Sequence, residues 1–165
     1  MFFWYNYYGD IMKLNPISFT LTVDRKVGVL KTPVGIYTTK EFNKGFKPLK
    51  RRYIALWDTG STMTVISDEL ASKLNLEPVG EMVAETAGGR YKAHKYILSL
   101  HLPNRLNIEN VMIASGKLGP GIDILIGMDI ITLGDFAITN YNNKTVFSFR
   151  FPSSEIIDFV KNDKK

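Results

Sequence analysis

Short apolar stretches bounded by Gly, Pro and Asn recur along the chain, a pattern typical of β-strands. Residues 17–23 alternate apolar and polar side chains, which predicts a half-buried strand. Residues 24–26 form a candidate turn, so we expect residues 27–37 to return as the next strand. Further strands are predicted at 52–57, 82–87, 91–102, 107–114, 122–126, 136–139 and 145–151. The chain is therefore predicted to be mostly β.

One helix interrupts the strands. Ser67 can cap it, and the run 68–74 is acidic at its start and basic at its end, as the helix dipole favours. Pro78 prevents a longer continuation. Shorter helical segments are predicted at 129–133 and in the tail at 153–161. Gly88-Gly89 and Asn142-Asn143 can each supply the turn of a hairpin.

The composition fits one compact domain. The chain has 165 residues, 45% of them hydrophobic. We divide it into an N-terminal extension (1–49), a core (50–151) and a C-terminal tail or helix (152–165). The absence of cysteine excludes disulfides, thiolate zinc sites and cysteine nucleophiles, and it favours a cytoplasmic location.

The net charge of +5 is concentrated in residues 40–52, where basic residues are interleaved with Phe42 and Phe46. Such a segment can bind nucleic acid or simply form a solvated loop. Because the total charge is modest, we do not expect a nucleic-acid partner. Residues 1–8 are aromatic but lack the basic start of a signal peptide and are too short to span a bilayer. We interpret them as a strand or packing arm and expect no membrane partner.

Asp58 is the most informative residue of the chain. It lies in a single Asp-Thr-Gly turn, within the stretch ALWDTGS at 55–61, directly after an apolar run. A carboxylate at the edge of a core can have its protonation set by its neighbours. Hydrolysis by carboxylates alone normally needs two acids that share a proton, and this chain has one such turn. The alternative is that Asp58 stabilises an ordinary turn in a non-catalytic domain.

Three segments, at 55–67, 68–76 and 123–131, resemble the retropepsin-like aspartic proteases, the family of retroviral proteases and their cellular and bacterial relatives. The family's apolar-apolar-Gly motif falls on Leu125, Ile126 and Gly127. The continuation Gly-Met-Asp is similar to the cellular and bacterial branch. The hairpin 82–96 lies where the family has its substrate-binding flap, with the tip at Ala87, Gly88 and Gly89.

The resemblance implies a fold, an assembly and a reaction. The fold would be a closed, mostly antiparallel β-barrel-like structure with one short helix. Two chains would meet as a homodimer and bring two Asp58 carboxylates together, which would titrate as one unit. The chain would then be an aspartic endopeptidase that activates a water between the two acids and cleaves a peptide or protein substrate, without a metal or a cofactor.

The resemblance also implies residue roles. Asp58 would be the catalytic acid and base, and Thr59 would hydrogen-bond across the dimer axis. Gly60 would donate a hydrogen bond to the carboxylate, and the Ser61 hydroxyl could bond its outer oxygen. Gly127 would let its strand pass close behind the Asp58 turn. Leu125 and Ile126 would support that strand.

Other polar residues are interpreted as structural. Asp129 is expected to hydrogen-bond backbone, and Asp135 does not lie in a second Asp-Thr-Gly. His94 and His101 are seven residues apart on a predicted strand, on opposite faces, so no metal site is expected. Ser61 lacks the G-x-S-x-G context of a serine hydrolase. The rival to the protease is a catalytically silent dimeric domain of the same fold that binds a peptide or protein.

Overall fold

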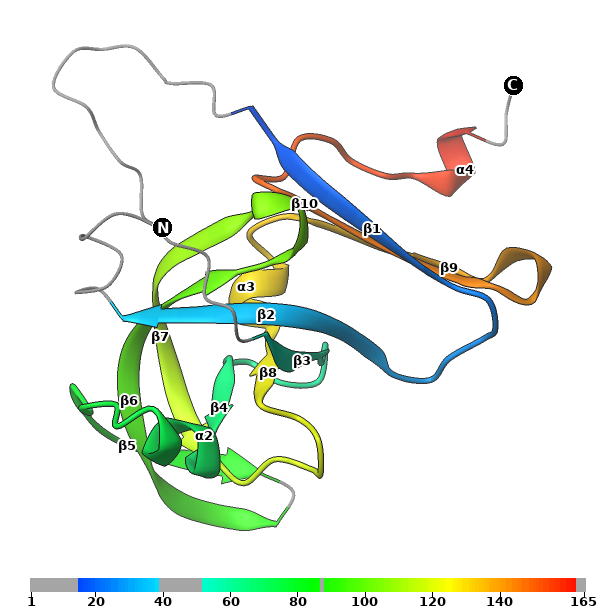
Figure 1. The fold of residues 1–165 in the computed structure, drawn as a ribbon. Coiled ribbons are helices and arrows are strands. Elements are labelled where there is room, and N and C mark those ends of the chain that lie inside the picture. Colours follow the sequence, from blue (N-terminus) through cyan, green and yellow to red (C-terminus); the bar gives the residue numbers. More distant parts are fainter. Residues whose placement is uncertain (1–14, 39–51, 87, 163–165) are drawn as a thin grey trace, which may run out of the picture.

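A computed structural model describes residues 15–38, 52–86 and 88–162 (Figure 1). The strands are β1 (Ile17–Val23), β2 (Leu30–Thr38), β3 (Tyr53–Trp57), β4 (Val65–Ser67), β5 (Gly80–Thr86), β6 (Gly89–His101), β7 (Asn107–Gly116), β8 (Ile124–Ile126), β9 (Asp135–Thr139) and β10 (Thr145–Phe151). The helices are α2 (Asp68–Lys73), α3 (Met128–Ile131) and α4 (Phe159–Asn162), with 3-10 turns η1 (Pro103–Arg105) and η2 (Tyr141–Asn143). The prediction of a mostly β protein is confirmed.

Seven strands form one sheet in the order β2-β3-β8-β4-β7-β6-β5, and β2 also pairs with β6. These pairings connect β2, β3, β8, β4, β7 and β6 into a ring. Most of these pairings are antiparallel, as expected, but β3 pairs with β8 and β4 pairs with β7 in parallel. Parallel neighbours need a long crossover, which the chain between β3 and β8 supplies. The alternation pattern of a single strand does not reveal this direction.

β1 lies in a second sheet, of order β1-β10-β9, and not beside β2. Figure 1 shows this sheet extending away from the seven-stranded one. The strand expected over 27–37 is present as β2, but it does not pair with β1. Phe19 of β1 instead packs against Phe147 and Phe149 of β10, with ring centroids 5.7 and 6.2 Å apart. A local turn signal predicts a change of direction but not the pairing partner.

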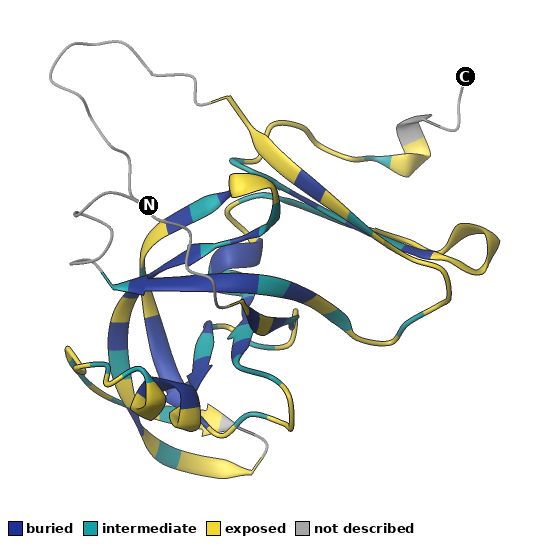
Figure 2. Cartoon of the chain, in the orientation of Figure 1, coloured by how far each residue is buried: buried dark blue, intermediate teal, exposed yellow. Residues whose placement is uncertain are grey.

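Trp57 joins the two sheets. Its ring centroid lies 5.1 Å from that of Phe147 and 4.9 Å from that of Phe149. Its indole nitrogen donates a hydrogen bond to the hydroxyl of buried Thr32 on β2, at 3.0 Å. Figure 2 shows the buried residues gathered along β2, β3, β6 and β7. Since Trp57 immediately precedes Asp58, the strand that carries the acid is anchored in this core.

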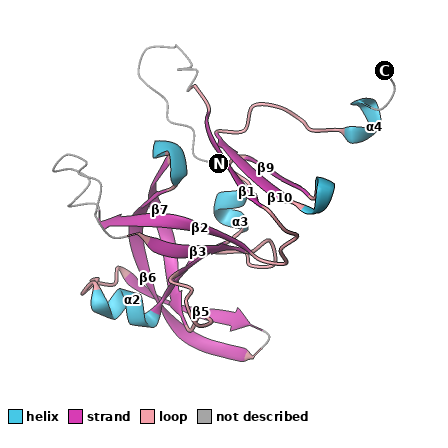
Figure 3. Cartoon of the chain, turned by 45° about the vertical axis from the view of Figure 1, so that its right-hand side comes forward, coloured by secondary structure: helices cyan, strands magenta, loops and turns pink. Residues whose placement is uncertain are grey.

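The local predictions hold for the helix and the hairpins. The Ser67 hydroxyl accepts a hydrogen bond from the Leu70 amide at 3.1 Å, so Ser67 caps α2 as expected. Leu70 and Ala71 are the buried residues of this helix. Figure 3 shows α2 beside β6, with the β5–β6 hairpin at the lower end of the view. Within the described ranges, no helix is long and apolar enough to cross a membrane.

Candidate active site

The Asp58 turn begins where β3 ends. The Asp58 amide donates to the Ile126 carbonyl oxygen at 2.9 Å, and the Ser61 amide donates to the Asp58 carbonyl oxygen at 3.2 Å. The Gly60 amide donates to Asp58 Oδ1 at 2.8 Å, which is the hydrogen bond predicted for Gly60. Asp58 is half-buried, whereas Thr59 and Gly60 are exposed. The backbone thus orients one carboxylate at the surface.

The apolar-apolar-Gly segment lies directly beside this turn. Leu125 and Ile126 pair in parallel register with Leu56 and Trp57 of β3. Gly127 follows, and a Cβ at this position would lie 2.5 Å from the carbonyl carbon and oxygen of Met63. No side chain fits there. The predicted close approach of the Gly127 backbone to the loop that follows Asp58 is therefore present.

A buried threonine that sequence reasoning missed links the two motifs. The Thr64 hydroxyl donates to Asp129 Oδ1 at 2.8 Å and accepts from the Gly127 amide at 3.2 Å. The Thr64 amide donates to Asp129 Oδ2 at 2.9 Å, and the Ile130 amide donates to Oδ1 at 3.0 Å. Thr64 has no exposed surface. The prediction that Asp129 hydrogen-bonds backbone is confirmed. A polar residue in the otherwise apolar run 63–66 is the signal that could have identified Thr64.

Asp123, which directly precedes β8, has a similar structural role at the other end of this strand. Its Oδ2 accepts from the Ile54 amide at 2.8 Å, and its amide donates to the Ile54 carbonyl oxygen at 2.9 Å. Its carbonyl oxygen accepts from the Ser67 amide at 2.9 Å. Asp123 therefore fixes β3 to the start of α2.

Ser61 differs from its expected role. Its hydroxyl donates to the Met63 carbonyl oxygen at 2.8 Å and not to the Asp58 carboxylate. The reason is the tight course of the loop, which brings the Met63 carbonyl within reach of a side chain two residues earlier. In this chain, Ser61 stabilises the loop that follows the acid.

The β5–β6 hairpin has the expected place in the sequence and the expected turn. Thr86 and Gly89 form its last pair, and Gly89 has a φ of 113°, which suits glycine. Gly88 is exposed, while the predicted flap residue Ala87 lies outside the described residues. One face of the hairpin carries two exposed ion pairs, Glu85–Arg90 at 2.6 Å and Glu81–Lys92 at 3.8 Å.

The residues of the opposite hairpin face are less exposed. Tyr91 lies on this face opposite Ala84, and its hydroxyl is 3.5 Å from the Ser115 carbonyl oxygen. A Cβ on Gly116 would lie 2.6 Å from the same hydroxyl. The hairpin therefore packs through this face, at Tyr91, against the end of β7.

The remaining candidate residues are spread over the molecule. His94 Nδ1 lies 4.0 Å from Glu81 Oε1, and His101 Nδ1 lies 2.7 Å from Asn107 Oδ1. In the described part of the chain, no three His, Cys, Asp or Glu side chains are grouped so as to hold a metal. Asp135 is engaged with Arg150 on the second sheet, at 2.6 Å.

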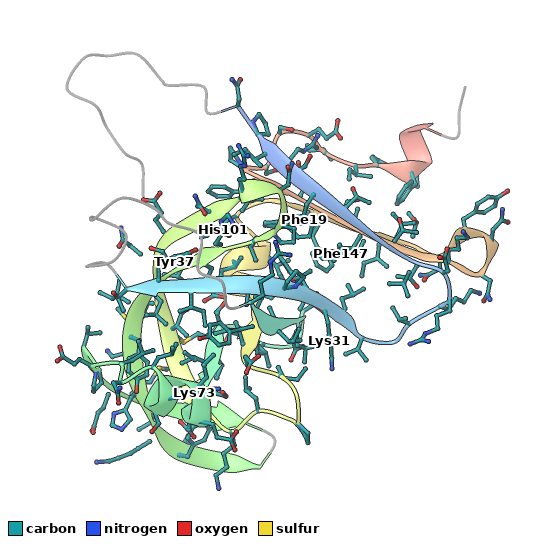
Figure 4. All side chains as sticks on the ribbon, viewed as in Figure 1. Phe19, Lys31, Tyr37, Lys73, His101 and Phe147 are labelled. Atoms are coloured by element: carbon teal, nitrogen blue, oxygen red, sulfur yellow. The ribbon has the colours of Figure 1, made fainter. Side chains whose placement is uncertain are left out.

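Two surface cavities, of about 350 and 480 Å³, lie away from the Asp58 turn, and Asp58 lines neither. The larger lies between α2 and β6 and is lined by Asp68, Leu76 and Tyr96, among others. Burial, and secondarily the nearby Asp68 charge, raises the pKa of Tyr96. Figure 4 shows the side chains on the ribbon.

The chain is similar to several solved structures. A retropepsin-like aspartic protease from Rickettsia conorii has 16% identity and a TM-score of 0.50, over 86% of this chain and 99% of that one. The retroviral protease-like domain of Ddi1 from Leishmania major has 14% identity and a TM-score of 0.42, over 79% and 100%. The protease of simian foamy virus has 21% identity and a TM-score of 0.39, over 61% and 89%. The first likeness shows a retropepsin-like fold.

A family model described as aspartyl protease matches residues 44–130, and this range contains the Asp58 turn, α2 and the Leu125-Ile126-Gly127 segment. The chain belongs to the aspartyl protease family. A sequence search among curated proteins found no match.

Proposed function

We propose that the chain is an aspartic endopeptidase that works as a homodimer, with one Asp58 from each copy. The observation that carries the proposal is the Asp58 turn itself. Its carboxylate is oriented by the Gly60 amide and exposed beside Thr59, while the backbone behind it is held in a buried hydrogen-bond network. An acid that only stabilised a turn would not need this support.

In the proposed dimer the two carboxylates lie too close to ionise together, so they share one proton. The ionised Asp58 removes a proton from a water, whose oxygen attacks the scissile carbonyl carbon. The protonated Asp58 hydrogen-bonds the carbonyl oxygen and stabilises the charge that develops there. A proton then passes to the leaving amine as the C–N bond breaks. Thr59 would hydrogen-bond across the dimer axis and hold the two turns together.

The substrate would be an extended peptide between the Asp58 turns and the β5–β6 hairpins, which would cover it. The tip residues Gly88 and Gly89, with Ala87, would approach the peptide backbone. We also propose that residues 1–165 act as one domain in the cytoplasm. The ring of pairings from β2 to β6 would serve as its closed barrel.

The test is Asp58→Asn, which keeps the shape of the side chain and removes its acidity. We expect peptide hydrolysis to fall at least about 100-fold, because the variant loses acid–base catalysis. The urea midpoint should stay near that of Asp24→Asn, a matched change of an exposed acid. The assay is cleavage of a mixed fluorogenic peptide library at high protein concentration.

Cleavage by Asp58→Asn at the rate of Asp24→Asn would refute the mechanism. If the native chain binds peptides from the library and cleaves none, the silent dimeric binding domain is the correct alternative.

A further inference from the structure

A cavity of about 350 Å³ lies at the end of β3 opposite Asp58. Arg52, which precedes β3, forms part of its wall. Tyr37 of β2 and His101 of β6 line it too, together with Asn104 and Arg105 of η1. The five residues of β3 separate Arg52 from Asp58, a span of roughly 20 Å at the usual rise of a strand. The cavity is therefore distinct from the candidate active site.

The charged groups of this cavity are all of one sign. Arg52 and Arg105 line it, and no acidic residue does so among those described. The ion pairs found in the described ranges involve neither arginine. A guanidinium remains charged at any physiological pH, and its planar fork of donors matches the oxygens of a phosphate. Two such groups at one cavity are suited to an oxyanion.

The loop that carries Arg105 has an unusual backbone. Asn104 and Arg105 have φ values of 56° and 60°, in the left-handed region. Every other non-glycine residue with a positive φ in the described part of the chain is an asparagine, the type that tolerates this region best. Arginine is not favoured there, so the surrounding structure must hold it.

That support is visible. The Asn104 side-chain amide donates to the Ser18 carbonyl oxygen of β1 at 2.7 Å. The Leu102 amide donates to the Leu106 carbonyl oxygen at 2.8 Å, and both leucine side chains are buried. The loop is thus closed at its base and tied to the second sheet. Arg105 is held at the cavity in a conformation that an arginine does not prefer.

The remaining wall is aromatic and preformed. The rings of Tyr37 and His101 lie 6.4 Å apart at 78°, and Figure 4 labels both beside β2. The amide oxygen of Asn107 can only accept a hydrogen bond, so the His101 Nδ1, 2.7 Å away, donates and the ring orientation is fixed. Tyr37 is only 4% exposed. Tyr37 therefore backs the wall, and half-buried His101 is the ring that can receive the less polar part of a ligand.

We propose that the cavity binds a small ligand that carries a phosphate group. Arg52 and Arg105 hold the phosphate, and the rest of the ligand lies against His101, which Tyr37 supports from behind. The volume is at the lower end of the range for small-molecule sites and exceeds what a phosphate alone would fill. Two exposed arginines at a surface cavity of this size favour a small molecule over the extended backbone of a nucleic acid. The site is independent of proteolysis.

The test uses inorganic phosphate and ADP as probes of the full chain, followed by amide chemical shifts and calorimetry. We expect saturable binding with shifts concentrated at residues 33–37 and 101–106. The decisive variant is Arg105→Asn, because asparagine suits the left-handed backbone while the guanidinium is lost. Its urea midpoint should be equal to or above that of the native chain, and its affinity for both probes should fall about tenfold or more. Arg52→Gln should weaken binding similarly.

Arg25→Gln is the matched control, since it removes an equal charge from an exposed residue outside the cavity. Its affinity should stay within about twofold of the native value, as a screened distant charge contributes little. Equal losses in Arg25→Gln and Arg105→Asn would overturn the proposal in favour of a general charge effect. If neither inorganic phosphate nor ADP binds saturably, the proposal is also overturned. A single-stranded oligonucleotide is a third probe. If the chain binds only this probe, and Arg105→Asn binds it equally well, then phosphate recognition belongs to a nucleic-acid surface outside the cavity.

Discussion

The two ends of β3 differ in whether one copy of the chain supplies all the residues of the proposed site. At one end, the Asp58 turn presents a single half-buried carboxylate beside exposed Thr59 and Gly60, outside both of the cavities described above. At the other end, Arg52 lines a cavity of about 350 Å³ together with residues of β2, β6 and η1. The first end needs a second acid to perform the proposed chemistry. The second end needs only a ligand.

The ends also differ in how they are supported. Behind Asp58, the buried hydroxyl of Thr64 bonds both the Asp129 carboxylate and the Gly127 amide. At the Arg52 end, the support is a short loop with two left-handed residues, tied to β1 by one side-chain hydrogen bond. We infer that changes behind Asp58 affect folding, whereas changes at the cavity affect chiefly binding.

The largest expected contrast between the ends appears on dilution. Well below the dissociation constant of the proposed dimer, peptidase activity per chain should fall about tenfold for each tenfold dilution, because each copy holds half the site. Phosphate affinity should not change over the same series. Initial rates of peptide cleavage and the phosphate dissociation constant, measured on the same samples, check both statements.

A mixing experiment sharpens this prediction. An excess of the Asp58→Asn chain should suppress the activity of the native chain by forming mixed dimers with one acid. Activity per chain that stays constant on dilution, and that the variant does not suppress, would show that one chain suffices.

The next effect concerns the backbone behind the acid. In Gly127→Ala, the new methyl would lie 2.5 Å from the Met63 carbonyl group, which is backbone and cannot move aside cheaply. We expect a loss of about 1–3 kcal/mol in the free energy of unfolding, measured in urea, and reduced peptidase activity. Phosphate binding by the folded fraction should persist, since the cavity is at the other end of β3.

Gly119→Ala is the control for this change. A Cβ at Gly119 would meet nothing within 4 Å, so its free energy of unfolding should stay within about 0.5 kcal/mol of the native value. If both alanine variants unfold at the same urea concentration, the close approach at Gly127 does not govern the stability of the Asp58 end.

The features that sequence predicted are those encoded by adjacent residues. The Ser67 cap, the Gly88-Gly89 turn and the Asp58 turn each depend on a few neighbouring side chains, and the structure contains all three. The close passage at Gly127 was predicted through a resemblance between whole motifs. In each case, local conformational preference and the final fold agree.

The features that sequence did not predict depend on distant partners. The aromatic packing of Phe19 places β1 beside β10, and no local turn signal encodes that choice. The hydrogen bond between Thr64 and Asp129 joins residues that are widely separated in the chain. The cavity is a further example, because Arg52 and Arg105 line the same cavity only once β2, β3 and η1 are in place.

The smallest predicted effect concerns an acid that contacts neither end of β3. Asp135 accepts hydrogen bonds from Arg150 Nε at 2.7 Å, from the Ser153 hydroxyl at 2.5 Å and from the Ser154 amide at 3.0 Å. Burial by itself would raise the pKa of Asp135, but these donors and the Arg150 charge outweigh it and lower the pKa to about 2. The carboxylate thereby fastens the start of the C-terminal tail to the second sheet.

Because the pKa of folded Asp135 is below its ordinary value of 3.8, the ionised group stabilises the fold above about pH 4, and this contribution is lost as the pH falls toward 2. Asp135→Asn should lower the free energy of unfolding at pH 7 by at most about 2 kcal/mol and should converge with the native chain near pH 2. Urea unfolding at pH 7, 4, 3 and 2 measures this.

Asp24→Asn, which removes an exposed partner of Lys144, should change the free energy of unfolding little at any pH. Parallel curves for Asp135→Asn and the native chain below pH 4 would show that other groups govern the acid sensitivity. At pH 7, the folded Asp135→Asn chain should retain both peptidase activity and phosphate binding. The substitution lowers the stability of the fold but does not change the residues at either end of β3.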